Sequence, residues 1–274
     1  MDFLARPLGI FLYWIYDTVA FQNYGLAIII FTLLVRIALF PLTLKQYKSS
    51  AQMQKFQPIL QEVQRKYAND KEKLNQETMK LYQEHKINPA GGCLPLLIQM
   101  PILFALWQTI TKPLKFMLGF TEQQLTELAT KANITSGAYT EIDTITYYVK
   151  NGMGDQVGNL NMFFPSENFG INLGLIPTWR PETLFSDPKY LIILIFPLLA
   201  AFTTFITSKL AMPKTTDKKS NPMGNSMLYI MPLMTLMFAF QFPTGLSLYW
   251  IAGNVVAIVQ QYYVNKYILK KKEW

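Results

Sequence analysis

Long apolar runs alternate with polar segments along the 274 residues of the chain. Five of these runs approach the roughly 20 residues that a helix needs to cross the hydrocarbon core of a bilayer. Only the turn signal Pro243-Thr244-Gly245 separates the last two runs, so they should form a tight helical hairpin. The pattern predicts an all-α membrane protein with five membrane-spanning helices, at residues 24–44, 93–112, 189–210, 226–243 and 245–265.

The segments outside these runs differ in periodicity and composition. Residues 1–23 carry apolar side chains at helical spacing, but their continuous apolar run is too short to span, which favours an interfacial amphipathic helix. Residues 45–88 are polar, with apolar positions three or four apart on either side of a break at Asn69-Asp70, which predicts a helical hairpin. Residues 118–187 are rich in Asn, Gly, Thr and aromatic residues and predict an irregular loop with short elements.

The distribution of charge predicts the orientation in the membrane. Three segments carry an excess of Lys and Arg: the hairpin, the short loop 211–225 and the tail 266–274. The loop 118–187 instead carries three basic and eight acidic residues. Because basic segments stay on the cytoplasmic side, this loop and the N-terminus should lie outside, and the hairpin and the C-terminus should lie in the cytoplasm.

Composition narrows the class of protein. Hydrophobic residues make up 51% of the chain and charged residues 15%, whereas a soluble domain has about 25% charged residues. The net charge of +8 comes from basic residues that flank apolar runs, so it reflects membrane topology and predicts no direct nucleic-acid readout. The chain has one cysteine, Cys93, which excludes an intramolecular disulfide and a cysteine metal cluster.

Arg36 is the only charged residue well inside a predicted span. A charge at that depth costs a few kcal/mol, so such residues generally face a bundle interior or a water-filled cavity and have a function. Thr32 lies one helical turn earlier on the same face. Because no predicted span contains Asp or Glu, we expect water or a passing substrate to solvate the guanidinium.

The third and fifth predicted spans also carry polar faces. The third span carries Thr203, Thr204 and Thr207. In the fifth, aromatic, small and polar residues recur every three to four positions. Several such faces favour one shared hydrophilic groove around Arg36. For any single Thr or Gln, ordinary hydrogen bonding between helices is the simpler interpretation. The candidate groove residues are Arg36, Thr32, Thr204, Tyr249, Trp250, Asn254 and Gln261.

Two other classes of protein fit this pattern less well. A secondary transporter commonly shows internal repeats, and ion coupling would use intramembrane acidic groups; the sequence shows neither. An intramembrane enzyme needs a nucleophile and a base within the spans, whereas the single histidine, His85, lies in the predicted hairpin. No enzymatic activity is expected, and a polytopic channel or secondary transporter is the alternative.

Two long stretches resemble a known family. They are MQKFQPILQEVQRKYANDKEKLNQETMKLYQEHKINPAGGCLPLLIQMPI, residues 53–102, and FPTGLSLYWIAGNVVAIVQQYYV, residues 242–264. Both resemble the YidC/Oxa/Alb family of membrane protein insertases, and within it the Gram-positive YidC type. The resemblance extends over nearly the whole chain apart from the loop 118–187, for which it implies nothing.

The resemblance implies both the site and the function. The arginine of the family's groove corresponds to Arg36, and Thr32, Tyr249 and Trp250 fall on groove positions. The implied activity is the insertion and chaperoning of nascent membrane proteins without ATP. The sequence agrees, because it contains no GxxxxGK[ST] phosphate loop.

The resemblance also implies a location and partners. The location is the plasma membrane of a bacterium. The partners are nascent membrane proteins and the lipid bilayer, with the ribosome, at the basic tail and the hairpin, and the Sec translocon as further candidates. No cofactor and no metal ion are expected.

Overall fold

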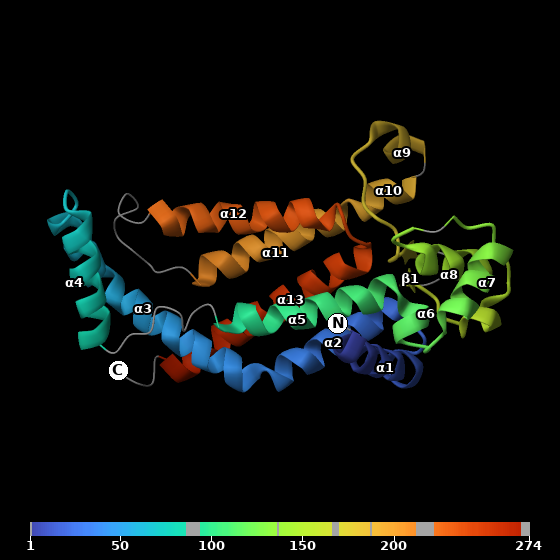
Figure 1. The fold of residues 1–274 in the computed structure, drawn as a ribbon, viewed down its shortest axis with the longest axis horizontal. Coiled ribbons are helices and arrows are strands. Elements are labelled where there is room, and N and C mark those ends of the chain that lie inside the picture. Colours follow the sequence, from blue (N-terminus) through green and yellow to red (C-terminus); the bar gives the residue numbers. More distant parts are fainter. Residues whose placement is uncertain are drawn as a thin grey trace.

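The structure is a computed structural model that describes residues 2–85, 94–135, 137–165, 170–186, 188–211 and 222–269. These residues form an elongated, mostly helical molecule (Figure 1). A bundle of long helices runs along the long axis, a helical hairpin projects from one end, and a group of short helices covers the other end. The bundle helices are α2 (Tyr24–Ala38), α5 (Leu94–Thr111), α11 (Ile195–Ala211), α12 (Pro222–Ala239) and α13 (Thr244–Tyr263).

Each bundle helix overlaps one predicted span, but length and apolarity alone single out fewer spans. Among the described helices, only the continuous stretch Pro188–Ala211, made of α10 (Pro188–Ile193) and α11, is long and apolar enough to cross a bilayer. A second qualifies if α2 and the bent continuation of its chain count together. Helix α13 has 20 residues, but its polar positions, such as Asn254 and Gln261, lower its mean hydropathy.

The predicted span 24–44 is divided between two helices. Helix α2 ends at Ala38, and α3 (Phe40–Lys66) starts two residues later at an angle of 64°. Pro41 stands in the first turn of α3, where its missing N–H is tolerated, whereas inside a continuous helix it would remove a hydrogen bond and clash with the preceding turn. This proline accounts for the break.

Helices α3 and α4 (Lys71–Glu84) occupy the segment for which a helical hairpin is predicted. The Asp70 side chain accepts a hydrogen bond from the backbone N–H of Lys73 at 3.0 Å and so caps the start of α4. The rings of Tyr82 and His85 pack against the buried Phe56 of α3 and hold the two helices together. Residues 86–93, which include Cys93, lie outside the described residues.

Helix α1 (Asp2–Thr18) packs against α2 and α5 and presents two apolar faces. Leu12 and Ile15, two of the apolar residues at helical spacing in this segment, are buried in the protein core. Phe3, Ile10 and Trp14 are exposed instead. The inward packing could not be read from periodicity, because the partner surface is formed by helices distant in the sequence.

The region between α5 and α10 is more regular than predicted. It contains α6 (Pro113–Phe116), α7 (Glu122–Lys131), α8 (Thr140–Lys150), a 3₁₀ turn (Gly154–Val157), the antiparallel strand pair β1 (Phe163–Phe164) and β2 (Ile171–Asn172), and α9 (Pro181–Ser186). Thr121 and Gln124 form a capping box at the start of α7. Apolar residues of α8, such as Ile142 and Ile145, join the main core. Burial of these side chains explains why the segment folds.

This region is fastened to the bundle by backbone hydrogen bonds at the start of α13. The N–H groups of Thr244 and Gly245 donate to the carbonyl oxygens of Leu175 and Leu173, at 2.9 and 2.7 Å. The first N–H groups of a helix have no partner within the helix. The connecting segment therefore supplies acceptors that the helix itself lacks, and it fixes the position of α13 against the rest of the molecule.

Candidate functional site

Arg36 lies in the last turn of α2, half-buried against α13. Its guanidinium lies over Gly253, where a Cβ atom would stand 3.1 Å from Nη2 and 3.6 Å from Nε. The missing side chain of Gly253 thus provides the space that the guanidinium occupies. Because α2 ends just beyond it, Arg36 also lies at the C-terminal end of a helix, where the helix dipole favours a cation.

The charge of Arg36 has no acidic partner in the part of the chain that the structure describes, where no ion pair involves this residue. An amide of α13 binds the backbone of the same residue. Gln260 Nε2 of α13 donates to the backbone carbonyl oxygen of Arg36 at 3.2 Å. Gln260 Oε1 is buried and has no hydrogen-bond partner among the described residues. Within the described residues, the C-terminal end of α2 is the feature that favours the cation, and the Gln260 amide holds the backbone of Arg36 against α13.

The polar face of α13 also holds α11. Asn254 Nδ2 donates to Thr203 Oγ1 at 3.1 Å and to Thr204 Oγ1 at 2.9 Å. Two helical turns further along α13, Gln261 Nε2 donates to the carbonyl oxygen of Leu210 at 2.8 Å. In membrane proteins such interhelical bonds contribute about 0.6 kcal/mol each on average. These side chains thus form hydrogen bonds between helices, which is the simpler interpretation that the sequence allows for any single Thr or Gln.

A third helix meets the same face of α13. The hydroxyl of Tyr47, near the start of α3, donates to the carbonyl oxygen of Ala257 at 3.2 Å. No pattern in the sequence singles out Tyr47, because the bend after α2 is what directs α3 toward α13. Helix α13 is therefore the element that α2, α3 and α11 share.

The predicted groove residues fall into two groups. Thr32 is 1% exposed, and its hydroxyl donates to the carbonyl oxygen of Ile28 at 2.6 Å; Tyr249 is 4% exposed and belongs to the main core. Arg36, Trp250, Asn254 and Thr204 are half-buried, and Gln261 is buried beside them. The structure brings Arg36, Asn254, Thr204 and Gln261 to one face of α13, and it buries Thr32 and Tyr249 one helical turn before Arg36 and Gly253.

The chemistry of this arrangement is that of a binding surface. It combines a cation with amide and hydroxyl groups. Among the residues that the structure describes, no group of three His, Cys, Asp or Glu side chains could hold a metal ion. The imidazole of His85 lies in the α3–α4 hairpin against Phe56.

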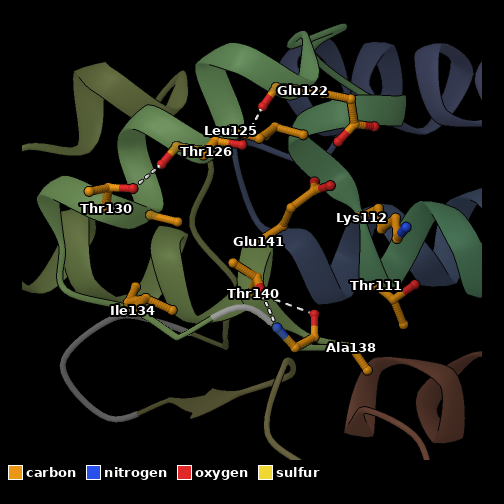
Figure 2. A pocket seen from close by; sticks show the side chains of 12 residues that line it. Thr111, Lys112, Glu122, Leu125, Thr126, Thr130, Ile134, Ala138, Thr140 and Glu141 are labelled. Carbon is orange, nitrogen blue, oxygen red and sulfur yellow. Dashed lines mark hydrogen bonds between the residues drawn. The ribbon is translucent and has the colours of Figure 1, made fainter.

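A separate cavity of about 380 Å³ lies between α7, α8 and the end of α5 (Figure 2). Threonines, Lys112 and two carboxylates line it, and Glu141 is the most buried of the charged groups, at 8% exposed. Glu141 Oε2 accepts a hydrogen bond from the backbone N–H of Lys115 at 3.1 Å, which ties α8 to α6. Burial raises the pKa of Glu141 to about 7, against a smaller lowering by backbone hydrogen bonds and by Lys112. Sequence patterns alone did not single out Glu141. The helical spacing of Glu141, Ile145 and Tyr148, which marks a buried helix face, is the signal that could have identified it.

The bundle and its inward polar face define a class: an α-helical membrane protein that keeps a cation and amide groups between its helices. Comparisons with known proteins identify the family within that class. The profile of a family described as "60Kd inner membrane protein" matches residues 14–272. The chain belongs to this family, which contains the bacterial YidC membrane protein insertases.

Curated relatives agree along most of the chain. A "Membrane protein insertase YidC" of Fusobacterium nucleatum is 33% identical over 244 residues, 89% of this chain and 87% of the relative. One of Oceanobacillus iheyensis is 36% identical over 259 residues, 92% of this chain and 78% of the relative. A "Membrane protein insertase YidC 2" of Bacillus anthracis is 36% identical over 248 residues, 89% and 72% of the two chains.

Other relatives are much longer. The match to a "Membrane protein insertase YidC" of Geobacter metallireducens, 33% identical, covers 97% of this chain but only 37% of the relative. The family resemblance read from the sequence is confirmed, and the family is one of insertases and not of catalytic enzymes. These names favour an insertase over a channel or secondary transporter.

The contact between Arg36 and Gly253 can be tested by adding a side chain at Gly253. Gly253→Leu should lower the free energy of unfolding by about 1–3 kcal/mol, because the new side chain displaces the guanidinium. Gly253→Ala should be near neutral, because Arg36 can shift slightly and Ala favours a helix by about 1 kcal/mol over Gly. Thermal unfolding in detergent measures both.

The control is the same pair of substitutions in an Arg36→Ala background. If the guanidinium is what Leu displaces, the destabilisation by Gly253→Leu should shrink there. An undiminished loss would show that other atoms of the bundle, and not Arg36, occupy the space at Gly253.

Glu141 predicts a pH dependence of stability. A carboxyl whose pKa is raised from 4.5 to about 7 in the fold favours the folded state when protonated. Its stabilisation is complete below the unfolded pKa and is lost as the pH rises through 7, by about 3 kcal/mol at most. Nearby charges act on it in both directions: Lys112 lowers the pKa and Glu122 raises it.

The measurement compares the wild type with Glu141→Gln in thermal unfolding between about pH 5 and pH 8.5. The amide oxygen of Gln can still accept from the N–H of Lys115 but does not titrate. The wild type should lose stability relative to the variant as the pH rises. Parallel profiles would mean that Glu141 titrates as an ordinary exposed carboxyl.

Proposed function

We propose that this chain inserts nascent membrane proteins through a hydrophilic groove built on the polar face of α13, with Arg36 as its cation. One observation carries the proposal: the guanidinium rests on Gly253 at the C-terminal end of α2 and has, within the described residues, no ion pair. A cation held in this way keeps its charge available to a passing chain.

The proposed mechanism follows from the barrier to insertion. A nascent membrane protein has to move a short polar segment across hydrocarbon, and loss of hydration opposes that step. A groove open to the cytoplasm and to lipid would carry water partway into the bilayer and lower the barrier. Arg36 would attract acidic or polar segments, because a charge acts strongly where the dielectric constant is low.

Transfer of the substrate's apolar segment into lipid supplies the driving force. Removal of apolar surface from water contributes about 25 cal/mol per Å², so no nucleotide is needed. In this account the substrate slides past Trp250, which is half-buried on α13. The buried acceptor Gln260 Oε1, unpaired within the described part of the chain, offers a site for water or for a substrate N–H.

Within the groove, Arg36, Thr204, Trp250, Asn254 and Gln261 would line the path of the substrate. Thr32 and Tyr249, one helical turn before Arg36 and Gly253, would form the closed end of the groove, in keeping with their burial. The bonds from Asn254 to α11 would keep the groove from closing or widening, because they fix the separation of α11 and α13.

The proposed orientation has five spans, α2, α5, α11, α12 and α13, with the N-terminus outside and the C-terminus in the cytoplasm. The α3–α4 hairpin, within the basic segment 45–88, lies at one end of the bundle (Figure 1). The α6–α8 helices, within the acidic segment 118–187 and just before it, lie at the opposite end. This separation of charge supports the orientation through the positive-inside rule.

The hairpin and the basic tail are the proposed contacts of the insertase with its cytoplasmic partners. Nascent membrane proteins are the substrates, and the lipid bilayer is the medium. The ribosome would meet the hairpin and the tail, and a Sec translocon would lie beside the bundle. Of the tail 266–274, residues 270–274 lie outside the described residues, as do residues 212–221 of the predicted loop 211–225.

Charge substitution at Arg36 tests the proposal. Arg36→Lys should retain most insertion of a single-span substrate with an acidic outer segment. Arg36→Ala should lower insertion about tenfold, the effect of ~1.4 kcal/mol, and should lower it less for a substrate with a neutral outer segment. Insertion is measured by protease protection of the substrate in proteoliposomes.

Lys209→Ala is the matched control, because Lys209 is an exposed cation in the last turn of α11. It should leave insertion nearly unchanged. Equal losses for Arg36→Lys and Arg36→Ala, with no dependence on substrate charge, would assign Arg36 a purely structural role and contradict the proposal.

A further inference from the structure

The segment 176–186, which contains α9, exposes two large aromatic side chains. Trp179 and Phe185 are each 76% exposed. Both lie only a few residues before the apolar stretch Pro188–Ala211. Large aromatic side chains exposed so close to an apolar helix indicate contact with an apolar partner.

The location of α9 indicates what that partner is. Helix α9 packs against α10, and α10 continues into α11 as the one straight helix of the described residues that is long and apolar enough to span. In Figure 1, α9 lies to the side of the bundle, close to the level along the long axis where α12 ends and α13 begins. It is thus beside the bundle and not on top of it.

The exposed apolar positions of this part of the chain continue from α9 into α11. After Trp179 and Phe185 come Leu191, Ile192, Ile195, Leu198, Leu199 and Phe202, all of them exposed. On a spanning helix these side chains face lipid. The aromatic residues of the α9 segment therefore extend a lipid-facing surface toward its end.

The residue types suit the boundary between headgroups and acyl chains. Trp is enriched at this depth because its ring is apolar and its N–H is polar. Arg180, next to Trp179, is exposed as well, and a guanidinium forms paired hydrogen bonds with phosphate groups. An aromatic pair with an adjacent arginine fits a phospholipid surface.

We propose that residues 176–186 bind the bilayer surface, with Trp179 and Phe185 inserted at the headgroup boundary of the leaflet nearest α6–α8. The occupant of this surface is phospholipid. In the proposed orientation this is the outer leaflet, so the inference rests on the proposed function for its sidedness. The segment then sets the depth of α10 and α11, and with α11 the depth of Thr203 and Thr204.

Site-directed spin labelling tests this inference. Cys93→Ser removes the single cysteine, and a nitroxide is attached in turn at Trp179→Cys, Phe185→Cys, Lys131→Cys and Phe202→Cys. Lys131 on α7 is the aqueous reference, and Phe202 on α11 is the hydrocarbon reference. The ratio of oxygen to nickel-chelate accessibility is measured in proteoliposomes of phosphatidylethanolamine and phosphatidylglycerol.

The expected ratios at positions 179 and 185 lie between those of the two references. Ratios equal to that of position 131, with position 202 in hydrocarbon, would overturn the lipid contact and leave the spanning helix intact. An aqueous ratio at position 202 would overturn both. Dipolar broadening at 179 or 185, absent after dilution with unlabelled protein, would replace lipid by a second copy of the chain and overturn the inference.

Insertion of a substrate by the same labelled proteins separates this inference from the proposed function. Insertase activity in a protein whose label at position 179 has an aqueous accessibility ratio would refute the lipid contact and leave the proposed function intact. A label at the headgroup boundary in a protein that lacks insertase activity would support the lipid contact and contradict the proposed function.

Discussion

The arrangement of the bundle depends on the meeting of Arg36 with the polar face of α13. Gly253 leaves room for the guanidinium of Arg36, and the side chain of Gln260 donates to the backbone carbonyl oxygen of Arg36. The face continues to Asn254, which binds α11. In surroundings that offer no water, polar groups must find partners within the protein, so the polar positions of α13 determine which helices lie beside it.

The same contacts connect the architecture to insertase activity. A carboxylate beside Arg36 would neutralise it and leave little attraction for a substrate. The structure instead places the cation at the carbonyl end of α2, among the backbone dipoles of its last turn. Such groups stabilise a positive charge without cancelling it. In the proposed mechanism, a polar segment of the substrate exchanges with water at Arg36 while its apolar neighbour enters lipid.

Periodicity predicted most of the helices, and the spacing of polar residues predicted which would lie on one face. Asn254 and Thr204, singled out on separate segments, form a hydrogen bond at 2.9 Å. Burial was harder to foresee: Thr32 and Tyr249 lie one helical turn from Arg36 and Gly253 but are almost fully buried, because neighbours distant in sequence cover them. The composition of residues 118–187 did not predict the helices α7 and α8. Their apolar residues, such as Ile145, pack against segments distant in the sequence, so the local apolar pattern is weak.

The central claim is that a nascent chain passes along α13 beside Arg36. Photocrosslinking tests it most directly, with a photoreactive residue at Trp250 and, as the control, at Tyr229, which is exposed on α12. A stalled single-span substrate with an acidic outer segment should form an adduct at position 250 and little or none at position 229. No adduct at position 250, or equal adducts at both positions, would contradict the account.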